Sequence, residues 1–574
     1  MKKLFCAIAV LALAVVACKK NEPVPQLVVD FSINPNPVIE GEEAQFVANV
    51  SGGVAPYSYA WKVGDVVSLT GAEAKWVATE KGTYAVTLTA TDAKGSSLSR
   101  SKNLVVEPKP IVATGEVTLL WTAQLEGYSA ITSPAIADDG SIYTATRDKN
   151  HFYKISKTGE IVWTKELLKN PQSGSNIYGT PSIDADGTIF MVGGDKGGDA
   201  TLVAYNPDGS EKWRFTDFWN SNGGAHSAKI EGANVAGIGD NNVYIGNTGT
   251  TGTVMAISKA DGQRVNFIKE SNGGGPAGGL RAGVVISNTG RLGWNGGAYG
   301  VFTAAQSALD TPGEGTPSAS RSIYSHQAGW PDGNNQGPVA IMKIGDKNCI
   351  VGTLSLKADN AEQVQNPQAA RTVVYAVDMA TGEEVAKVKV DQCAKQDQGG
   401  VAITEEGYIV AGLKYTAGKD DGGIVLVDPV QNVQVGHYGL AENVACPPAI
   451  DQAGNIHFGT EAGNYYVVKY KGNGEFETLV KKDIAELVAN DSRYSQAFAH
   501  LTETIEESGK RNFAKIWSGI VIGDDGTILI QFTDNDNRAV GGLAAINVDY
   551  TTGPSTQSPW PMMGQNRKHT NRQK

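Results

Sequence analysis

The sequence predicts an all-β protein, with an immunoglobulin-like sandwich over residues 27–107 and a β-propeller of about eight four-stranded blades over residues 117–574. The chain of 574 residues contains 69 glycines and 23 prolines, which favour many turns between short strands. Short stretches alternate apolar and polar residues, as half-buried strands do. From residue 132 onward a hairpin pattern also returns about every 55 residues, a spacing typical of propeller blades.

The N-terminus has the form of a bacterial export and lipidation signal. Lys2 and Lys3 precede the apolar stretch LFCAIAVLALAVVA, which is short for a membrane span. It ends at Cys18 and resembles a lipoprotein lipobox, with Val15 where Leu is usual. The resemblance implies a signal peptide over 1–17, lipidation of Cys18 and a membrane-bound tether over 18–26. An ordinary secretory peptide is the alternative.

The residue after Cys18 is not Asp. By the same resemblance, this favours the outer membrane of a Gram-negative bacterium, at either its cell surface or its periplasmic face.

Residues 27–107 are expected to fold as the sandwich. The stretch TYAVTLTATDAKG alternates strictly and ends in a turn, as a strand entering a hairpin does. Together with GGVAPYSYAW (residues 52–61) it resembles the PKD domain, although the family's GDG turn is only Gly64-Asp65-Val66 here. We expect Trp61 to lie in the core and the Pro-containing segment 108–116 to be a linker.

The repeat begins with TSPAIADDGSIYTA (132–145), which returns as GTPSIDADGTIFMV (179–192). A second hairpin follows most copies, as in LVAYNPDGSEKWRFTD, so each repeat has four strands. These motifs and the tail SPWPMMGQNRKHT resemble the PQQ-like propeller superfamily. LLWTAQL (119–125) precedes the first copy, and we expect it to pair near residues 541–549 as the outer strand of the last blade. Further copies lie at 236–246, 283–294, 339–352, 401–412, 447–457 and 519–530.

No cofactor and no metal is predicted. Quinoprotein dehydrogenases of this superfamily carry adjacent cysteines and a Ca²⁺ site, whereas Cys349, Cys393 and Cys446 stand far apart. The sequence leaves two possibilities for these cysteines: two of them form a disulfide, or they remain buried, unpaired thiols. The seven histidines show no metal-ligand spacing, and the net charge of −11 without a basic run argues against nucleic acid as a partner.

Five side chains are candidates for ligand contact, and each is weighed against a role in packing. Segment 216–228 holds Trp219, and the polar stretch 303–337, expected to be a long loop, holds Tyr324, His326 and Trp330. Trp294 is the fifth candidate. A further insertion over 484–515 is rich in helix formers and predicts a helix outside the blade.

These features predict a non-catalytic, outer-membrane-anchored lipoprotein whose propeller binds a glycan or a protein. One alternative is an outer-membrane assembly or scaffold factor, similar to the propeller lipoprotein of the barrel-assembly machinery, which usually lacks a PKD module. The other is a polysaccharide-cleaving propeller enzyme, whose paired carboxylates cannot be assigned among the many turn aspartates.

Overall fold

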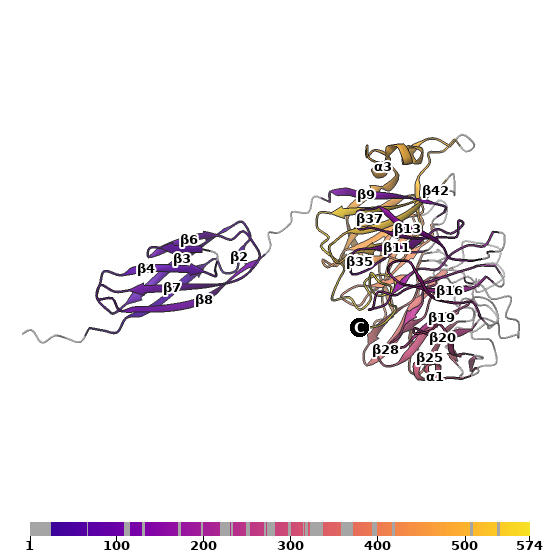
Figure 1. The fold of residues 1–574 in the computed structure, drawn as a ribbon, viewed down its shortest axis with the longest axis horizontal. Helices are drawn as coiled ribbons and strands as arrows, with labels where there is room; N and C mark the ends of the chain where they lie inside the picture. The colour runs from indigo at the N-terminus through magenta and orange to yellow at the C-terminus, as the bar shows by residue number, and fades with distance from the viewer. Residues whose placement is uncertain are drawn as a thin grey trace, which may run out of the picture. The chain divides into compact units, whose positions relative to one another are not determined.

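The computed structural model divides the chain into two compact units, Met1–Val112 and Ala113–Lys574 (Figure 1). It describes residues 24–574 except 66, 108–114, 129–131, 170, 172–173, 197–198, 219–229, 231–233, 248–252, 269–270, 273–281, 297–299, 314, 316–318, 322–336, 357–370, 393–398, 416–419, 506–508 and 536–539.

The first unit is the predicted sandwich. Trp61 is 2% exposed, and its ring meets that of Phe31 edge-on at 5.1 Å, so the expectation that it lies in the core is confirmed. Its indole nitrogen donates to the carbonyl of Gly71 at 2.9 Å, which satisfies the one polar atom that burial would otherwise isolate. One sheet has the order β1 (Val28–Asn34), β3 (Glu43–Ser51), β6 (Glu73–Val77); the other has the order β2 (Val38–Ile39), β8 (Ser97–Glu107), β7 (Gly82–Thr91), β4 (Ser58–Val63), β5 (Val67–Thr70).

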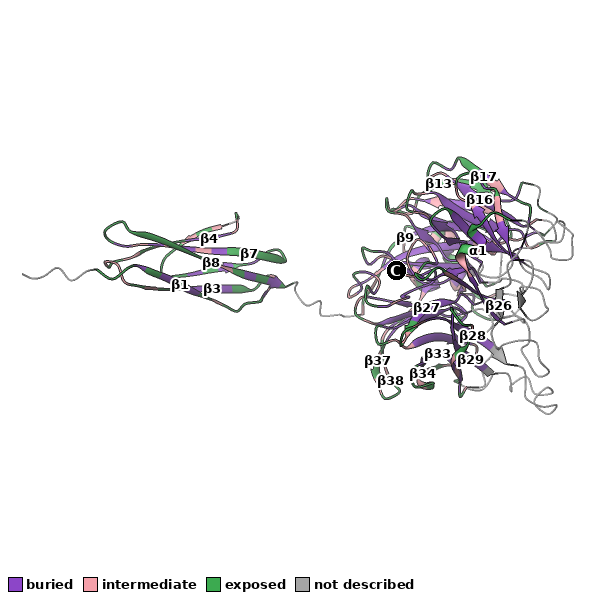
Figure 2. Cartoon of the chain, turned by 90° about the horizontal axis from the view of Figure 1, so that it is seen from below, coloured by how far each residue is buried: buried purple, intermediate pink, exposed green. Residues whose placement is uncertain are grey.

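The second unit contains eight sheets among its described residues, which agrees with the predicted number of blades; their strand pairs are antiparallel except for the parallel pair of β22 and β26. Figure 2 shows that burial is concentrated in the inner strands, because each blade packs its faces against its neighbours. The first four blades are β10 (Ala135–Ile136), β11 (Ile142–Ala145), β12 (His151–Ile155), β13 (Ile161–Glu166); β14 (Ser182–Ile183), β15 (Ile189–Gly193), β16 (Thr201–Tyr205), β17 (Glu211–Phe215); β18 (Gly237–Ile238), β19 (Asn242–Gly246), β20 (Val254–Ser258), β21 (Arg264–Phe267); and β23 (Val285–Ile286), β24 (Arg291–Asn295), β25 (Val301–Ala305), β26 (Ala319–Arg321), with β22 (Ser271–Asn272) beside β26.

The remaining four blades continue this pattern. They are β27 (Ala340–Ile344), β28 (Lys347–Leu356), β29 (Arg371–Asp378), β30 (Glu384–Lys389); β31 (Val401–Ile403), β32 (Ile409–Leu413), β33 (Gly422–Asp428), β34 (Val433–Leu440); β35 (Ala449–Ile450), β36 (Ile456–Gly459), β37 (Asn464–Gly472), β38 (Glu475–Asp483); and β39 (Ala514–Ile516), β40 (Val521–Ile522), β41 (Ile528–Asp534), β42 (Val540–Val548), β9 (Val117–Glu126).

The ring closes as the sequence predicted. β9 pairs antiparallel with β42, with Thr122 opposite Ala544, so the first strand of the unit is the outer strand of its last blade. In Figure 1 the indigo β9 lies beside the yellow β42. This pairing covers the edge of β42 that would otherwise be open to other chains.

A tryptophan–glycine contact links several neighbouring blades. The indole nitrogens of Trp121 and Trp213 donate to the carbonyls of Lys157 and Lys259 in the following blade, both at 2.9 Å. Each ring lies against a turn glycine: a Cβ on Gly262 would meet the Trp213 ring at 2.6 Å. The repeated glycine and tryptophan of the second hairpin are therefore the two halves of one contact between blades.

The C-terminal segment, residues 549–574 after β42, runs across the inner strands at the end of the ring where the Asp-Gly turns lie. Its carbonyls accept the main-chain N–H of the isoleucine that ends the inner strand in six blades, at 2.7–3.0 Å. These N–H groups lie on the strand edge that no other strand pairs with, so the segment satisfies them. The donors are Ile136, Ile183, Ile238, Ile286, Ile403 and Ile450, and the acceptors are the carbonyls of Arg567, Lys568, Thr570, Asn571, Trp560 and Pro561, respectively.

The structure corrects the prediction for one insertion and confirms it for another. The stretch 303–337 is not a loop throughout, because it holds the end of β25, the short helix α1 (Gln306–Asp310) and β26, which supplies the fourth strand of its blade. The sequence did not predict β26, because apolar and polar residues do not alternate along it. The helix predicted over 484–515 is confirmed as α3 (Ile484–Ala489) and α4 (Ser495–Phe498), which lie outside the blade sheet.

Candidate functional site

Four of the predicted ligand-contact residues, Trp219, Tyr324, His326 and Trp330, lie outside the described residues. Trp294 is described and is 0% exposed. Its ring stacks on Phe302 with centroids 5.8 Å apart and an interplanar angle of 9°. A side chain with no exposed surface offers no face to a ligand, so the packing role that the sequence left open for Trp294 is the one the structure supports.

The two described cysteines do not lie together as a redox pair would. Cys349 and Cys446 are unpaired and buried, in hydrophobic clusters of different blades. Burial raises the pKa of each thiol to about 12, so both stay protonated near neutral pH. Cys393 lies outside the described residues.

A groove with a volume of about 630 Å³ lies between the second and third blades. It opens at the end of the ring where the Asp-Gly turns lie. Its walls come from the β14–β15 turn, from β17, and from the two turns of the third blade. The side chains that give it charge are Asp184, Asp186, Asp240, Asp310, Lys212 and Lys259.

One ion pair crosses the groove from blade to blade. Nζ of Lys259 lies 2.6 Å from a carboxylate oxygen of Asp184, with the two side chains 19% and 14% exposed. The same ammonium donates to the carbonyl of Gly239 at 2.9 Å. Because both partners are largely shielded from water, this contact fixes the spacing of the two blades more firmly than an exposed pair would.

Two further carboxylates of the groove, Asp186 and Asp240, are stabilised in the ionised form. Burial opposes the charge on Asp186, but hydrogen bonds from Thr188 and the charges of Lys212 and Lys259 outweigh it and lower its pKa. Hydrogen bonding and charge from Arg572 in the C-terminal segment lower the pKa of Asp240. The groove therefore carries fixed negative charge beside fixed positive charge.

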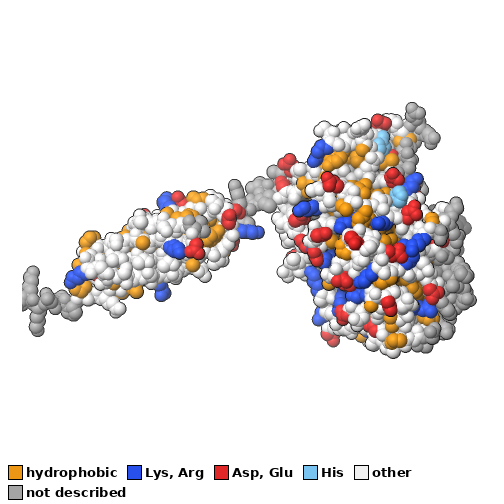
Figure 3. Space-filling view, viewed as in Figure 1, with side chains coloured by type: hydrophobic (Ala, Val, Ile, Leu, Met, Phe, Trp, Pro, Cys, Tyr) orange, Lys and Arg blue, Asp and Glu red, His pale blue; other side chains and the backbone are white. Residues whose placement is uncertain are grey.

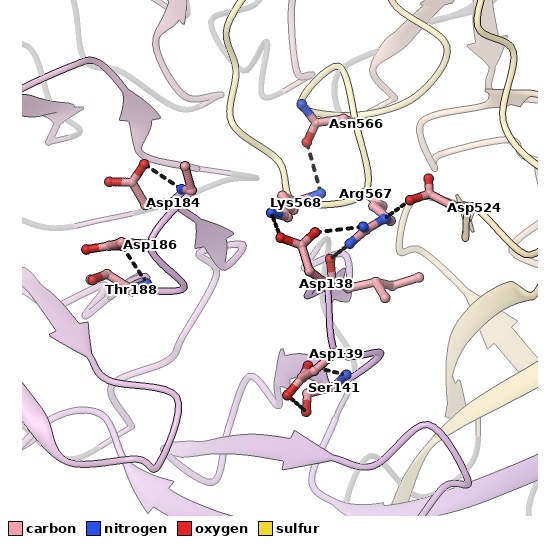
Figure 4. A network of polar contacts seen from close by, with 12 residues as sticks. Asp138, Asp139, Ser141, Asp184, Asp186, Thr188, Asp524, Asn566, Arg567 and Lys568 are labelled. Carbon is pink, nitrogen blue, oxygen red and sulfur yellow. Dashed lines mark hydrogen bonds and ion pairs between the residues drawn. The ribbon is translucent and has the colours of Figure 1, made fainter.

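A second polar network joins the C-terminal segment to the first and last blades (Figure 4). Arg567 donates to Asp138 at 2.9 Å and to Asp524 at 2.7 Å, and Lys568 donates to Asp138 at 2.5 Å. Hydrogen bonds from Lys568 and Arg567 lower the pKa of the Asp138 carboxyl. These contacts anchor the segment by its side chains, in addition to its main-chain bonds.

Both networks went unnoticed in the sequence, where their aspartates look only like turn residues. Asp138, Asp184 and Asp240 occupy equivalent turns, and a turn alone accounts for Asp there. For the second network a signal does exist: the tail places Arg567 and Lys568 side by side, and two adjacent cations favour carboxylate partners on the ring. On the propeller face drawn in Figure 3 the acidic and basic side chains are interspersed, without a field of one sign.

Comparison with known families identifies the two units. The family model described as PKD domain matches residues 27–107, and the one described as outer membrane protein assembly factor BamB matches residues 87–335. The chain joins a PKD domain to a PQQ-like propeller. The second match begins inside β7 of the PKD domain, whereas the PQQ-like propeller itself begins with β9. No curated protein matches this chain significantly.

Three solved structures resemble parts of this chain. A europium-containing methanol dehydrogenase is 13% identical with a TM-score of 0.51, over 76% of this chain and 94% of that one. BamB from Moraxella catarrhalis is 11% identical with a TM-score of 0.45, over 75% of this chain and 100% of that one. The PKD1 domain of Vibrio cholerae metalloprotease PrtV is 28% identical with a TM-score of 0.13, over 14% of this chain and 96% of that one. At these identities the methanol dehydrogenase supports the propeller fold and nothing more.

The described residues do not fit the quinone and Ca²⁺ of the dehydrogenases that share this fold. The adjacent cysteines are missing from the sequence, and Cys349 and Cys446 lie in separate clusters. Across the described ranges no three His, Cys, Asp or Glu side chains are grouped as metal ligands.

Proposed function

We propose that this protein is a non-catalytic binding protein, anchored to an outer membrane, whose propeller holds a protein or a glycan. The observation that carries the proposal is the groove between the second and third blades. It is preformed between packed blades, and the Asp184–Lys259 pair sets its width. A groove that is already rigid loses little conformational entropy when a partner binds to it, and this favours recognition.

The electrostatics of the groove support binding rather than catalysis. A general acid needs a carboxyl whose pKa is raised toward neutrality. The pKa values of Asp186 and Asp240 are lowered instead, so neither carboxyl is kept protonated near neutral pH as a general acid would be. Fixed charges of both signs suit a polar or zwitterionic segment of a partner.

The membrane anchor remains part of the proposal. Cys18 and the signal segment 1–17 lie outside the described residues, so the lipobox-like sequence alone supports them. Of the helices in the described residues, none is long and apolar enough to cross a bilayer. A lipid on Cys18 would hold the chain at the membrane through a tether.

The aromatic stretch around Trp330, Tyr324 and His326 is a second proposed contact. Flat rings stack on sugars or fill pockets in a partner and often dominate binding energy. We expect Trp330→Ala to weaken capture of the partner by about 2 kcal/mol, with little change in melting temperature. An unchanged capture by the folded variant would remove this stretch from the site.

Capture from intact cells tests the proposal. The tagged full chain is recovered after mild crosslinking, and bound proteins and glycans are identified. The variant Lys212→Glu reverses a charge in the groove, and Lys165→Glu makes the same change on the exposed strand β13 outside it. We expect the partner to be lost only with Lys212→Glu. Loss with both variants, or with neither, would place recognition elsewhere.

An assembly factor is the second candidate, and the match of residues 87–335 to the BamB family model favours it. In that case the partner would be a component of the machinery that assembles outer-membrane proteins. Deleting the gene should then lower the amounts of several outer-membrane proteins at once. Unchanged amounts in the deletion strain would leave the binding role without this assembly function.

A further inference from the structure

The groove between the second and third blades carries more negative than positive charge. Four carboxylates and two ammonium groups line it. Both ammonium groups already face a carboxylate of the lining: Nζ of Lys259 lies 2.6 Å from Asp184, and Nζ of Lys212 lies 3.7 Å from Asp186. A group that enters the groove therefore meets an excess of carboxylate.

Asp310 is the groove carboxylate that no cation neutralises among the described residues. Asp240, the remaining carboxylate, pairs with Arg572 of the C-terminal segment. Asp310 contacts neutral donors instead: Nδ2 of Asn242 donates to its Oδ1 at 2.8 Å, and the hydroxyl of Tyr244 donates to the same oxygen. Asp310 is exposed, and its Oδ2 accepts no hydrogen bond from a described residue. The lining of the groove thus includes a carboxylate with hydrogen-bonding capacity to spare.

Hydrogen bonds hold this carboxylate in place. Nε2 of Gln306 donates at 2.9 Å to the hydroxyl of Tyr244, which in turn donates to Asp310. The ring of Tyr244 is fully buried. Asp310 is also the last residue of α1, and negative charge is not favoured at the carboxyl end of a helix. The stability of α1 therefore does not explain this charge.

The lining of the groove suits an organic cation better than a metal ion. Across the part of the chain that the structure describes, no three His, Cys, Asp or Glu side chains are grouped as metal ligands. Small apolar side chains also line the groove, namely Ala185, Ala260 and Val265. The aliphatic stem of lysine or arginine packs against such surface while its charged end reaches a carboxylate. A neutral sugar offers Asp310 no positive charge.

We propose that the groove binds a lysine or arginine side chain of a protein partner, with the ammonium or guanidinium group on Asp310. The site is that of the proposed function, on which the inference rests, and the partner is then a protein rather than a glycan. A cation on a carboxylate that is already fixed makes a charge-assisted hydrogen bond, which is the stronger kind. Lys212, on the second blade, can receive an acceptor group of the same partner.

Fluorescence anisotropy on the purified full chain tests this inference. The probes are a labelled peptide of alternating glycine and lysine, the matched peptide of glycine and glutamate, and a labelled neutral dextran oligosaccharide. An ionic strength of about 0.15 M screens the long-range attraction of the lysine peptide to an acidic chain.

The variant Asp310→Asn removes the charge but keeps an oxygen that accepts from Asn242 and Tyr244. Asp65→Asn is the matched control, because it makes the same change on a side chain of the PKD domain that is 98% exposed. Thermal unfolding checks that both variants are folded. If the carboxylate of Asp310 only fastens α1 to the third blade, Asp310→Asn should bind the lysine peptide as the wild type does.

We expect the wild type and Asp65→Asn to bind the lysine peptide saturably, and more tightly than the other two probes. Binding by Asp310→Asn should be weaker by about fivefold or more. Equal affinity of a folded Asp310→Asn variant, no saturable binding of the lysine peptide, or tighter binding of either other probe would overturn the inference. The proposed function fails separately, because the capture test with Lys212→Glu leaves Asp310 unchanged.

Discussion

At the scale of single residues, the contact of a turn glycine with a tryptophan explains how neighbouring blades are held together. We expect Gly262→Ala to destabilise the propeller by about 2–4 kcal/mol, from the strain of φ +73° and from the clash of the new Cβ with the Trp213 ring. Gly290→Ala is the matched control, because φ is +72° there and no atom lies within 4 Å. Denaturant unfolding measures both, and equal losses would show that the tryptophan contact is unimportant.

His569 makes the stability of the propeller depend on pH. It is fully buried, and burial lowers its pKa from 6.5 to about 4, although Nδ1 donates to the carbonyl of Pro181 at 3.0 Å. Between pH 6.5 and about pH 4, His569 is protonated in the unfolded chain but not in the folded chain. The free energy of unfolding therefore falls as the pH is lowered through this range. The loss from pH 7 to pH 4 is about 3 kcal/mol for this group.

Asn tolerates the φ of +53° at this position, so His569→Asn should fold and should lose this part of the pH dependence. Urea unfolding of both proteins between pH 4 and 7 measures the difference. If the free energy of unfolding changes equally with pH in the wild type and the variant, His569 takes up its proton in the folded state.

Single residues were predictable where a repeat or a motif gave them a role. Trp61 is predictable as a core residue because GGVAPYSYAW resembles the core strand of the PKD domain. The groove was not predictable, because Asp184 and Lys259 come from turns of different blades and every blade has a similar turn. The place of Asp310 in the groove depends on the short helix α1, which no periodic pattern encodes.

At the scale of the elements, β9 is the strand on which closure depends. Arg493, from the insertion after β38, donates to the carbonyls of Leu119 and Leu120 in β9, both at 2.9 Å, so two distant segments hold this strand. A fragment of residues 127–574 lacks β9 and exposes the edge of β42. We expect it to aggregate, while a 112–574 fragment stays soluble.

Light scattering and thermal unfolding of the two fragments measure this effect. Equal solubility and equal melting temperatures would mean that the ring does not need β9. The pairing itself was predictable because LLWTAQL resembles the outer strands of other blades but precedes the first inner strand. β26 was not predictable, because the stretch around it is polar and does not alternate.

For the molecule as a whole, the proposed lipid on Cys18 would determine where the propeller works. If Cys18 carries the lipid, Cys18→Ser should move the protein from the membrane fraction to the soluble fraction, because several acyl chains anchor a protein firmly and none remain in the variant. Cell fractionation followed by immunoblotting measures this. Membrane retention of Cys18→Ser would contradict the proposed lipidation of Cys18.

We propose that the propeller binds its partner in the groove between the second and third blades. A photo-crosslinking amino acid at position 186, inside the groove, tests this most directly in intact cells. Position 162 is the control, because Val162 is 55% exposed on the outer strand β13 of the first blade. We predict a discrete crosslinked species from position 186 and none from position 162. Crosslinks of the same species from position 162, or none from position 186, would contradict the claim.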